Sequence, residues 1–89
     1  MLEEKVVIIN SLGLHARPAS KIVALASKFS SRVEFYYQNK IVNAKSIMGV
    51  MMLAASKNTE MLLKIEGEDE SAAMAALTQL ISSRFGEAE

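Results

Sequence analysis

The sequence contains no cysteine, one proline, one histidine and four glycines. Without cysteine it forms no disulfide bond, thiol nucleophile or zinc site with thiolate ligands, and this composition suits a reducing compartment. No apolar run approaches the ~20 residues that span a bilayer, and the apolar run in MLEEKVVIIN is too short for a signal peptide. We therefore expect a cytoplasmic protein that does not insert into a membrane.

The charges balance, because ten lysines and arginines face ten aspartates and glutamates. Proteins that bind nucleic acid usually carry a basic excess. An RNA-binding module also needs exposed aromatic residues, which Phe35, Tyr36 and Tyr37 supply only in part. We expect no nucleic-acid partner. The 89 residues are 51% hydrophobic, without a repeat or linker, and predict a single domain over residues 1–89.

The hydrophobic pattern predicts seven elements in the order β-α-β-β-α-β-α. The expected strands cover residues 5–9, 32–37, 41–43 and 60–66. The first expected helix has Pro18 in its first turn and continues to Phe29, the second covers 47–56, and the third begins at the acids 68–70 and closes near Gly86. Three amphipathic helices need an apolar surface, so the pattern favours one sheet with all three helices on one face. The other face would then meet water, which suits Glu34, Lys64 and Glu66.

The segment GLHARP places the only histidine, His15, directly before a helix. A lone histidine in a turn is most simply a solvated or packing residue. Three neighbours favour a functional interpretation. Gly13 permits a sharp turn, and Pro18 fixes the helix start, whose unpaired N–H groups attract anions. Arg17 adds a guanidinium group that matches the geometry of phosphate.

A neutral imidazole beside such an anion site has the groups needed for covalent phosphoryl transfer. No cluster of Mg²⁺-binding acids and no glycine-rich nucleotide loop accompanies it, so we expect no metal, no cofactor and no direct use of ATP. The protein would receive a phosphoryl group from one protein and pass it to another. The residues alone leave both interpretations of His15 open.

A second candidate segment is KSIMGVM, where Ser46 precedes a short apolar helix. Ser46 is most simply an N-cap worth about 1 kcal/mol, and regulatory phosphorylation is the alternative. The helix is apolar on every side, so one side faces the core while another is left for a partner. Methionine is common on adaptable docking surfaces, although it also fills gaps in cores.

Together, GLHARPAS and KSIMGVM in a β-α-β-β-α-β-α chain of this length resemble the HPr family. These are the small histidine phosphocarriers of the bacterial phosphoenolpyruvate-dependent phosphotransferase system, and the resemblance covers essentially the whole chain. It implies an α+β open-faced β-sandwich, with a four-stranded antiparallel sheet and three helices on one face. It also implies that enzyme I phosphorylates His15 on Nδ1, that Arg17 supports the phosphoryl group, and that enzyme IIA accepts it.

The resemblance implies further partners. HPr kinase/phosphorylase phosphorylates the serine matching Ser46 in many lineages, and a transcriptional regulator is another expected partner. The residues expected to contact partners are Ala16, Ile47, Met48, Met51 and Met52. We expect a monomer.

Two departures from the family pattern bear on function. Many sugar-transport carriers have glycines after the second helix, where this chain has Ala54 and Asn58, although asparagine tolerates the left-handed backbone of a turn. The run MMLAAS is more similar to carriers of Gram-negative bacteria, including those of a nitrogen-related branch. The sequence therefore leaves open which protein accepts the phosphoryl group.

Two other function classes compete with the carrier. A regulatory protein of a nitrogen or carbon-catabolite phosphorelay would act by binding, and would not need His15. An acylphosphatase-like enzyme has a similar size, but its glycine-rich loop with a phosphate-binding arginine differs from the segment around His15. Rapid hydrolysis of acyl phosphate would favour that enzyme.

Overall fold

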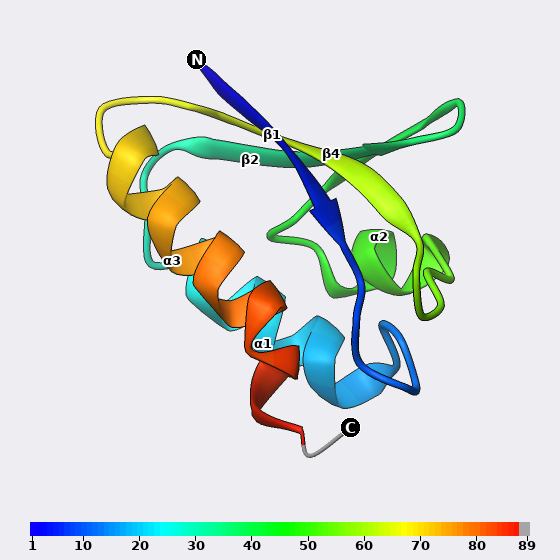
Figure 1. Ribbon diagram of the computed structural model, residues 1–89. Helices are drawn as coiled ribbons and strands as arrows, with labels where there is room; N and C mark the ends of the chain where they lie inside the picture. Colours follow the sequence, from blue (N-terminus) through cyan, green and yellow to red (C-terminus); the bar gives the residue numbers. More distant parts are fainter. Residues whose placement is uncertain (88–89) are drawn as a thin grey trace.

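The predicted order of strands and helices is confirmed in a computed structural model, which describes residues 1–87 (Figure 1). The elements are β1 (Leu2–Val7), α1 (Ala16–Ala26), β2 (Arg32–Tyr37), β3 (Lys40–Asn43), α2 (Ile47–Met52), β4 (Glu60–Glu66) and α3 (Glu70–Ser82), followed by a short 3-10 turn, η1 (Arg84–Gly86). Among residues 1–87 the longest helix, α3, has 13 residues, and no helix has the length and apolar character that crossing a membrane requires.

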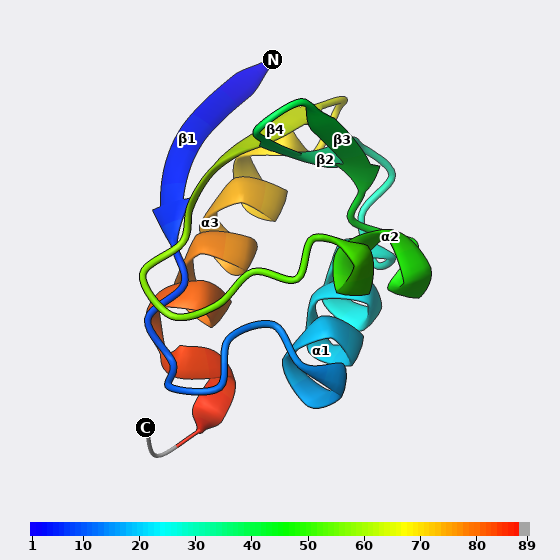
Figure 2. The same cartoon turned by 90° about the vertical axis from the view of Figure 1, so that its right-hand side faces the viewer.

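The four strands form one antiparallel sheet in the order β1-β4-β2-β3. All three helices lie on one side of this sheet, as Figures 1 and 2 show, so the predicted α+β architecture is confirmed. Alternate strand residues point toward the helices, and Val33, Phe35, Leu63 and Ile65 are fully buried there. Residues of α1 and α3 complete a single core, which holds the helices against the sheet.

The opposite face of the sheet carries the polar residues predicted for it, Glu34, Lys64 and Glu66, together with the exposed apolar residues Val7 and Ile41. Glu34 and Lys64 are direct cross-strand partners. The Lys64 ammonium lies 4.3 Å from the ring centroid of Tyr36 and 3.5 Å from the Glu3 carboxylate. Such solvated pairs add little stability.

The first two elements have different ends from those predicted. β1 covers Leu2–Val7 rather than residues 5–9, because its ladder with β4 runs from the Leu2–Ile65 pair to the Val7–Glu60 pair. α1 begins at Ala16, so Pro18 lies in its first turn as predicted, but the helix ends at Ala26 rather than reaching Phe29. Phe29 therefore packs against the core from the loop that follows the helix rather than from the helix itself.

The second helix is shorter than predicted, because α2 ends at Met52 rather than at residue 56. Ala54 has a left-handed φ of 51°, which a continuing helix cannot contain. Asn58 has a φ of 73°, and this confirms that asparagine keeps a turn here without glycine.

The last helix also ends early, at Ser82. Arg84, Phe85 and Gly86 then take left-handed φ values of 59°, 57° and 77°. Gly86, predicted to close the last helix, closes η1 instead. The left-handed residues turn the chain back, so that Glu87 lies against the segment before α1.

Candidate functional site

His15 is the N-cap residue of α1, with extended backbone angles (φ −76°, ψ −173°). Its carbonyl accepts the N–H of Ala19 at 3.0 Å, while its side chain is free of any capping role and 36% exposed. Because Pro18 has no N–H, the amides of Ala16 and Arg17 are the donors that the first turn leaves open among the described residues. The predicted placement of His15 at a helix start is therefore confirmed.

Gly13 allows the segment before His15 to pack closely on the chain after α2. Its φ is 66°, in the left-handed region. The next residue, Leu14, donates its N–H to the Ala55 carbonyl at 2.8 Å. A Cβ on Gly13 would lie 2.8 Å from the Ser56 Cα and closer still to the Ala55 oxygen. Glycine is thus required by both its conformation and its lack of a side chain.

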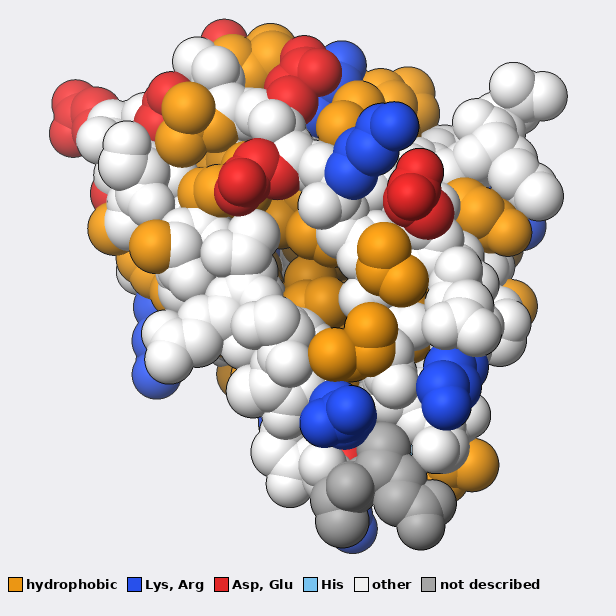
Figure 3. All heavy atoms as spheres, in the orientation of Figure 1, with side chains coloured by type: hydrophobic (Ala, Val, Ile, Leu, Met, Phe, Trp, Pro, Cys, Tyr) orange, Lys and Arg blue, Asp and Glu red, His pale blue; other side chains and the backbone are white. Residues whose placement is uncertain are grey.

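Arg17 lies in the first turn of α1, and its side chain is exposed. Within residues 1–87 it makes no hydrogen bond or ion pair, to His15 or to any other residue. In Figure 3, basic side chains gather toward the lower end of the molecule, where Figure 1 places the start of α1 and the end of the chain. A solvated guanidinium beside open N–H groups is suited to hold a phosphoryl group.

Two further residues complete this site, and neither was predicted from the sequence. The His15 Nε2 atom lies 2.7 Å from Glu87 Oε2. The other Glu87 oxygen accepts a hydrogen bond from Asn10 Nδ2 at 2.9 Å. The Asn10 hydrogen bond is the main cause of a pKa of the Glu87 carboxyl below its ordinary value, and the His15 hydrogen bond lowers it further. No local pattern announces these contacts, because 72 residues separate His15 from Glu87.

Ser46 is the N-cap of α2, as predicted in its simpler interpretation. Its Oγ accepts the N–H of Gly49 at 3.2 Å, and its carbonyl accepts the N–H of Val50 at 3.0 Å. The side chain is half-buried. The serine therefore has a structural role in starting α2, whether or not it is modified.

The outer side of α2 is an exposed apolar surface. We call the residues Ile47, Met48, Met51 and Met52 the α2 patch, and their exposed fractions run from 38% to 66%. The other side of α2 packs into the core through Val50. The three methionines therefore do not fill gaps in the core. Such an exposed cluster is typical of a docking surface.

Two further apolar residues are exposed close to His15 in the sequence. Ala16, predicted to contact partners, is exposed directly after His15. Leu12 is 75% exposed in the turn before Gly13. The sequence analysis missed Leu12, although a large apolar residue in an otherwise polar turn is the signal that could have found it.

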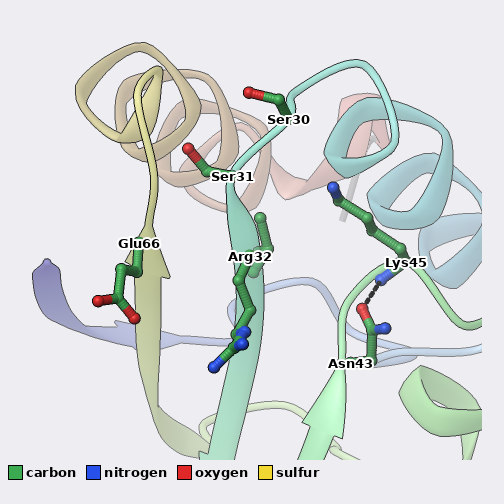
Figure 4. A pocket seen from close by; sticks show the side chains of 7 residues that line it. Ser30, Ser31, Arg32, Asn43, Lys45 and Glu66 are labelled. Atoms are coloured by element: carbon green, nitrogen blue, oxygen red, sulfur yellow. Dashed lines mark hydrogen bonds between the residues drawn. The ribbon is translucent and has the colours of Figure 1, made fainter.

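An open hollow elsewhere on the molecule does not include His15 or Ser46. Figure 4 shows the side chains around it, which come from β2, from the ends of β3 and β4 and from neighbouring loops. The Lys45 ammonium there donates to the Phe29 carbonyl at 2.7 Å, and the Ser31 hydroxyl donates to Asp69. These groups are occupied in joining loops, so the hollow offers no site comparable to that around His15.

Comparison with known proteins agrees with this geometry. The family described as "PTS HPr component phosphorylation site" matches residues 2–83. Phosphocarrier protein HPr of Xylella fastidiosa is 51% identical over 87 residues, 98% of each chain. A crystal structure of HPr from Thermoanaerobacter tengcongensis superimposes with a TM-score of 0.96, at 50% identity and full coverage of both chains.

A crystal structure of an HPr dimer from the same organism is 52% identical to this chain. It superimposes with a TM-score of 0.79, covering 98% of this chain and 100% of its own. The agreement in sequence and fold, over nearly the full length of both relatives, shows that this chain belongs to the HPr phosphocarrier family of the phosphotransferase system.

Proposed function

We propose that this protein accepts a phosphoryl group on His15 from phosphorylated enzyme I and donates it to an enzyme IIA component. The observation that carries the proposal is the position of His15 at the N-cap of α1, partly exposed and directly before the open amides of Ala16 and Arg17. An imidazole attacks phosphorus with its lone pair. The helix start and the guanidinium then hold the negative oxygens of the transferred group.

Each transfer exchanges one bond to phosphorus for another. When the protein is loaded, the bond between phosphorus and the donor breaks as the His15 N–P bond forms. In the second step the His15 N–P bond breaks as the acceptor attacks. The site needs no nucleotide of its own, because its donor already carries an activated phosphoryl group.

A relay reconstituted from purified parts tests this function. The protein is incubated with enzyme I, Mg²⁺ and phosphoenolpyruvate, and the label is followed into the protein and then into a cognate enzyme IIA. We expect an acid-labile, base-stable phosphoprotein that His15→Ala abolishes. Ser20→Ala, an exposed residue of α1, serves as the control and should be labelled normally. A wild-type protein that enzyme I leaves unlabelled would refute the carrier function.

The proposed docking surface for both partners consists of the α2 patch with Ala16. These side chains are exposed and apolar, and α1 packs beside α2, so one partner surface can cover them together. A flexible methionine surface accommodates partners of different shape. We further propose that the protein acts as a cytoplasmic monomer, which light scattering at working concentration would test against a dimer.

A second proposed function is regulation through Ser46, by HPr kinase/phosphorylase and a transcriptional regulator. The observation that favours it is that Ser46 directly precedes the α2 patch. A phosphate there would add about two negative charges beside an apolar docking surface. With ATP and the cognate kinase we expect an acid-stable label that Ser46→Ala removes. If no label forms, Ser46 is only a cap. If His15→Ala leaves the biological function intact, the protein acts by binding alone.

A further inference from the structure

The C-terminal segment from Arg84 to Glu87 is built into the site around His15. The Phe85 side chain is fully buried and anchors the segment in the core. The left-handed turn at residues 84–86 then reverses the chain. The Lys21 ammonium of α1 donates to the Phe85 carbonyl and fixes the segment beside the helix. Backbone strain of this kind persists only where the surrounding structure enforces it.

The Glu87 carboxylate is held by two different partners, one on each oxygen. Oε1 accepts from Asn10 Nδ2 at 2.9 Å, and Oε2 lies 2.7 Å from His15 Nε2. Asn10 is fully buried, and its second N–H donates to the Gly13 carbonyl at 2.8 Å. Its Oδ1 has no partner within residues 1–87. Both hydrogens of this amide are therefore used to hold the loop and Glu87, although leaving the buried Oδ1 without a partner is costly.

We infer that Glu87 is a positioning residue that keeps the proton of His15 on Nε2, so that Nδ1 carries the lone pair that attacks phosphorus. This inference rests on the proposed carrier function. A carboxylate only accepts hydrogen bonds, so its neighbour Nε2 must be the protonated nitrogen. The 2.7 Å distance is that of a charge-assisted hydrogen bond.

The same hydrogen bond serves both transfer steps. When Nδ1 bonds to phosphorus, the ring gains a positive charge, which the carboxylate at Nε2 stabilises. When the N–P bond breaks, the bonding electrons return to Nδ1 while the proton stays on Nε2. Neutral imidazole then leaves rather than the far more basic imidazolate. Glu87 exchanges no proton in either step.

Two substitutions at Glu87 separate this role from a merely structural one. Glu87→Ala removes the acceptor, and we expect transfer from enzyme I to slow about five- to tenfold. In Glu87→Gln, the Asn10 amide still donates to the side-chain oxygen, so the new NH₂ group faces His15 Nε2. An NH₂ group only donates, so Nε2 must accept its hydrogen bond and the ring proton moves to Nδ1. Nδ1 then has no free lone pair to attack phosphorus, which is the wrong-tautomer effect seen when an amide replaces the carboxylate beside a catalytic histidine. The isosteric glutamine should therefore slow transfer more than alanine.

The measurement combines transfer rates with ¹⁵N NMR of the His15 ring, at a pH where the ring is neutral. We expect the proton on Nε2 in the wild type and a shift toward Nδ1 in Glu87→Gln. Glu68→Gln removes an equal charge from an exposed residue and should change neither rate nor tautomer. The inference fails if the His15 ring keeps its proton on Nε2 in the Glu87→Gln variant, or if Glu87→Gln slows transfer less than Glu87→Ala does. Failure of wild-type phosphorylation would refute the carrier function instead, while the NMR result still decides the role of Glu87.

Discussion

Replacing Gly13 with alanine should destabilise the protein strongly and disturb the start of α1. The left-handed φ of 66° costs an L-residue about 1–2 kcal/mol. The new Cβ would also lie 2.8 Å from the Ser56 Cα. Because this neighbour is backbone, two chain segments must separate, at about 1–2 kcal/mol. The hydrogen bond from Leu14 to Ala55 would weaken, at about 1 kcal/mol. Together these costs should lower the free energy of unfolding by about 3–5 kcal/mol.

The matched control is the same substitution at Gly49. A Cβ there meets nothing nearer than 3.4 Å, and Gly49 lies inside α2, where alanine is favoured by about 0.5–1 kcal/mol. In urea unfolding, Gly13→Ala should therefore lower the free energy of unfolding and Gly49→Ala should raise it. In thermal unfolding, Gly13→Ala should lower the Tm by more than about 12 °C. If the free energy of unfolding of Gly13→Ala lies within about 0.5 kcal/mol of the wild-type value, the close contact between residue 13 and the backbone of Ser56 does not constrain this position.

Three other predictions follow from particular residues. Ala54→Gly should raise the free energy of unfolding by about 0.5–1 kcal/mol, because Ala54 has a φ of 51°; a less stable variant in urea would contradict this. Hydrogen bonds from the Ser31 hydroxyl and, to a lesser extent, the Ser30 amide lower the pKa of Asp69 below its ordinary value of 3.8. The ionised Asp69 therefore stabilises the folded protein above pH 3.8, and this contribution is lost as the pH falls through the lowered pKa. Urea unfolding of wild type and Asp69→Asn should therefore converge in acid, and a constant difference would be contrary evidence. Met48→Glu should leave the Tm unchanged, because the side chain is 66% exposed, yet slow transfer to enzyme IIA; unchanged transfer kinetics would remove Met48 from the docking surface.

The parts of the fold that repeat a local pattern were predictable from sequence. Alternation in RVEFYY indicated that Val33 and Phe35 face the core, and both are fully buried. The proline in GLHARP indicated a helix start, and His15 is its N-cap. These features depend on neighbouring residues, whose spacing the sequence displays directly.

The parts that depend on distant contacts were not predictable. The residue type of Ala54 does not predict the end of α2, because alanine is a helix former and is held here in a left-handed conformation. Glu87 is one of many acidic residues, and only the turn around the buried Phe85 brings it to His15. Asn10 reads as an ordinary turn residue, although its amide joins the two ends of the chain. Tertiary packing decides all three.

The most direct test of the central claim is to identify the phosphorylated atom. The protein, labelled with ¹⁵N in its single histidine, is phosphorylated by enzyme I and phosphoenolpyruvate and examined by ³¹P and ¹⁵N NMR. We predict one phosphorus signal, coupled to Nδ1 of His15, with the proton on Nε2. A phosphorus bonded to Nε2, or to a residue other than His15, would contradict the account.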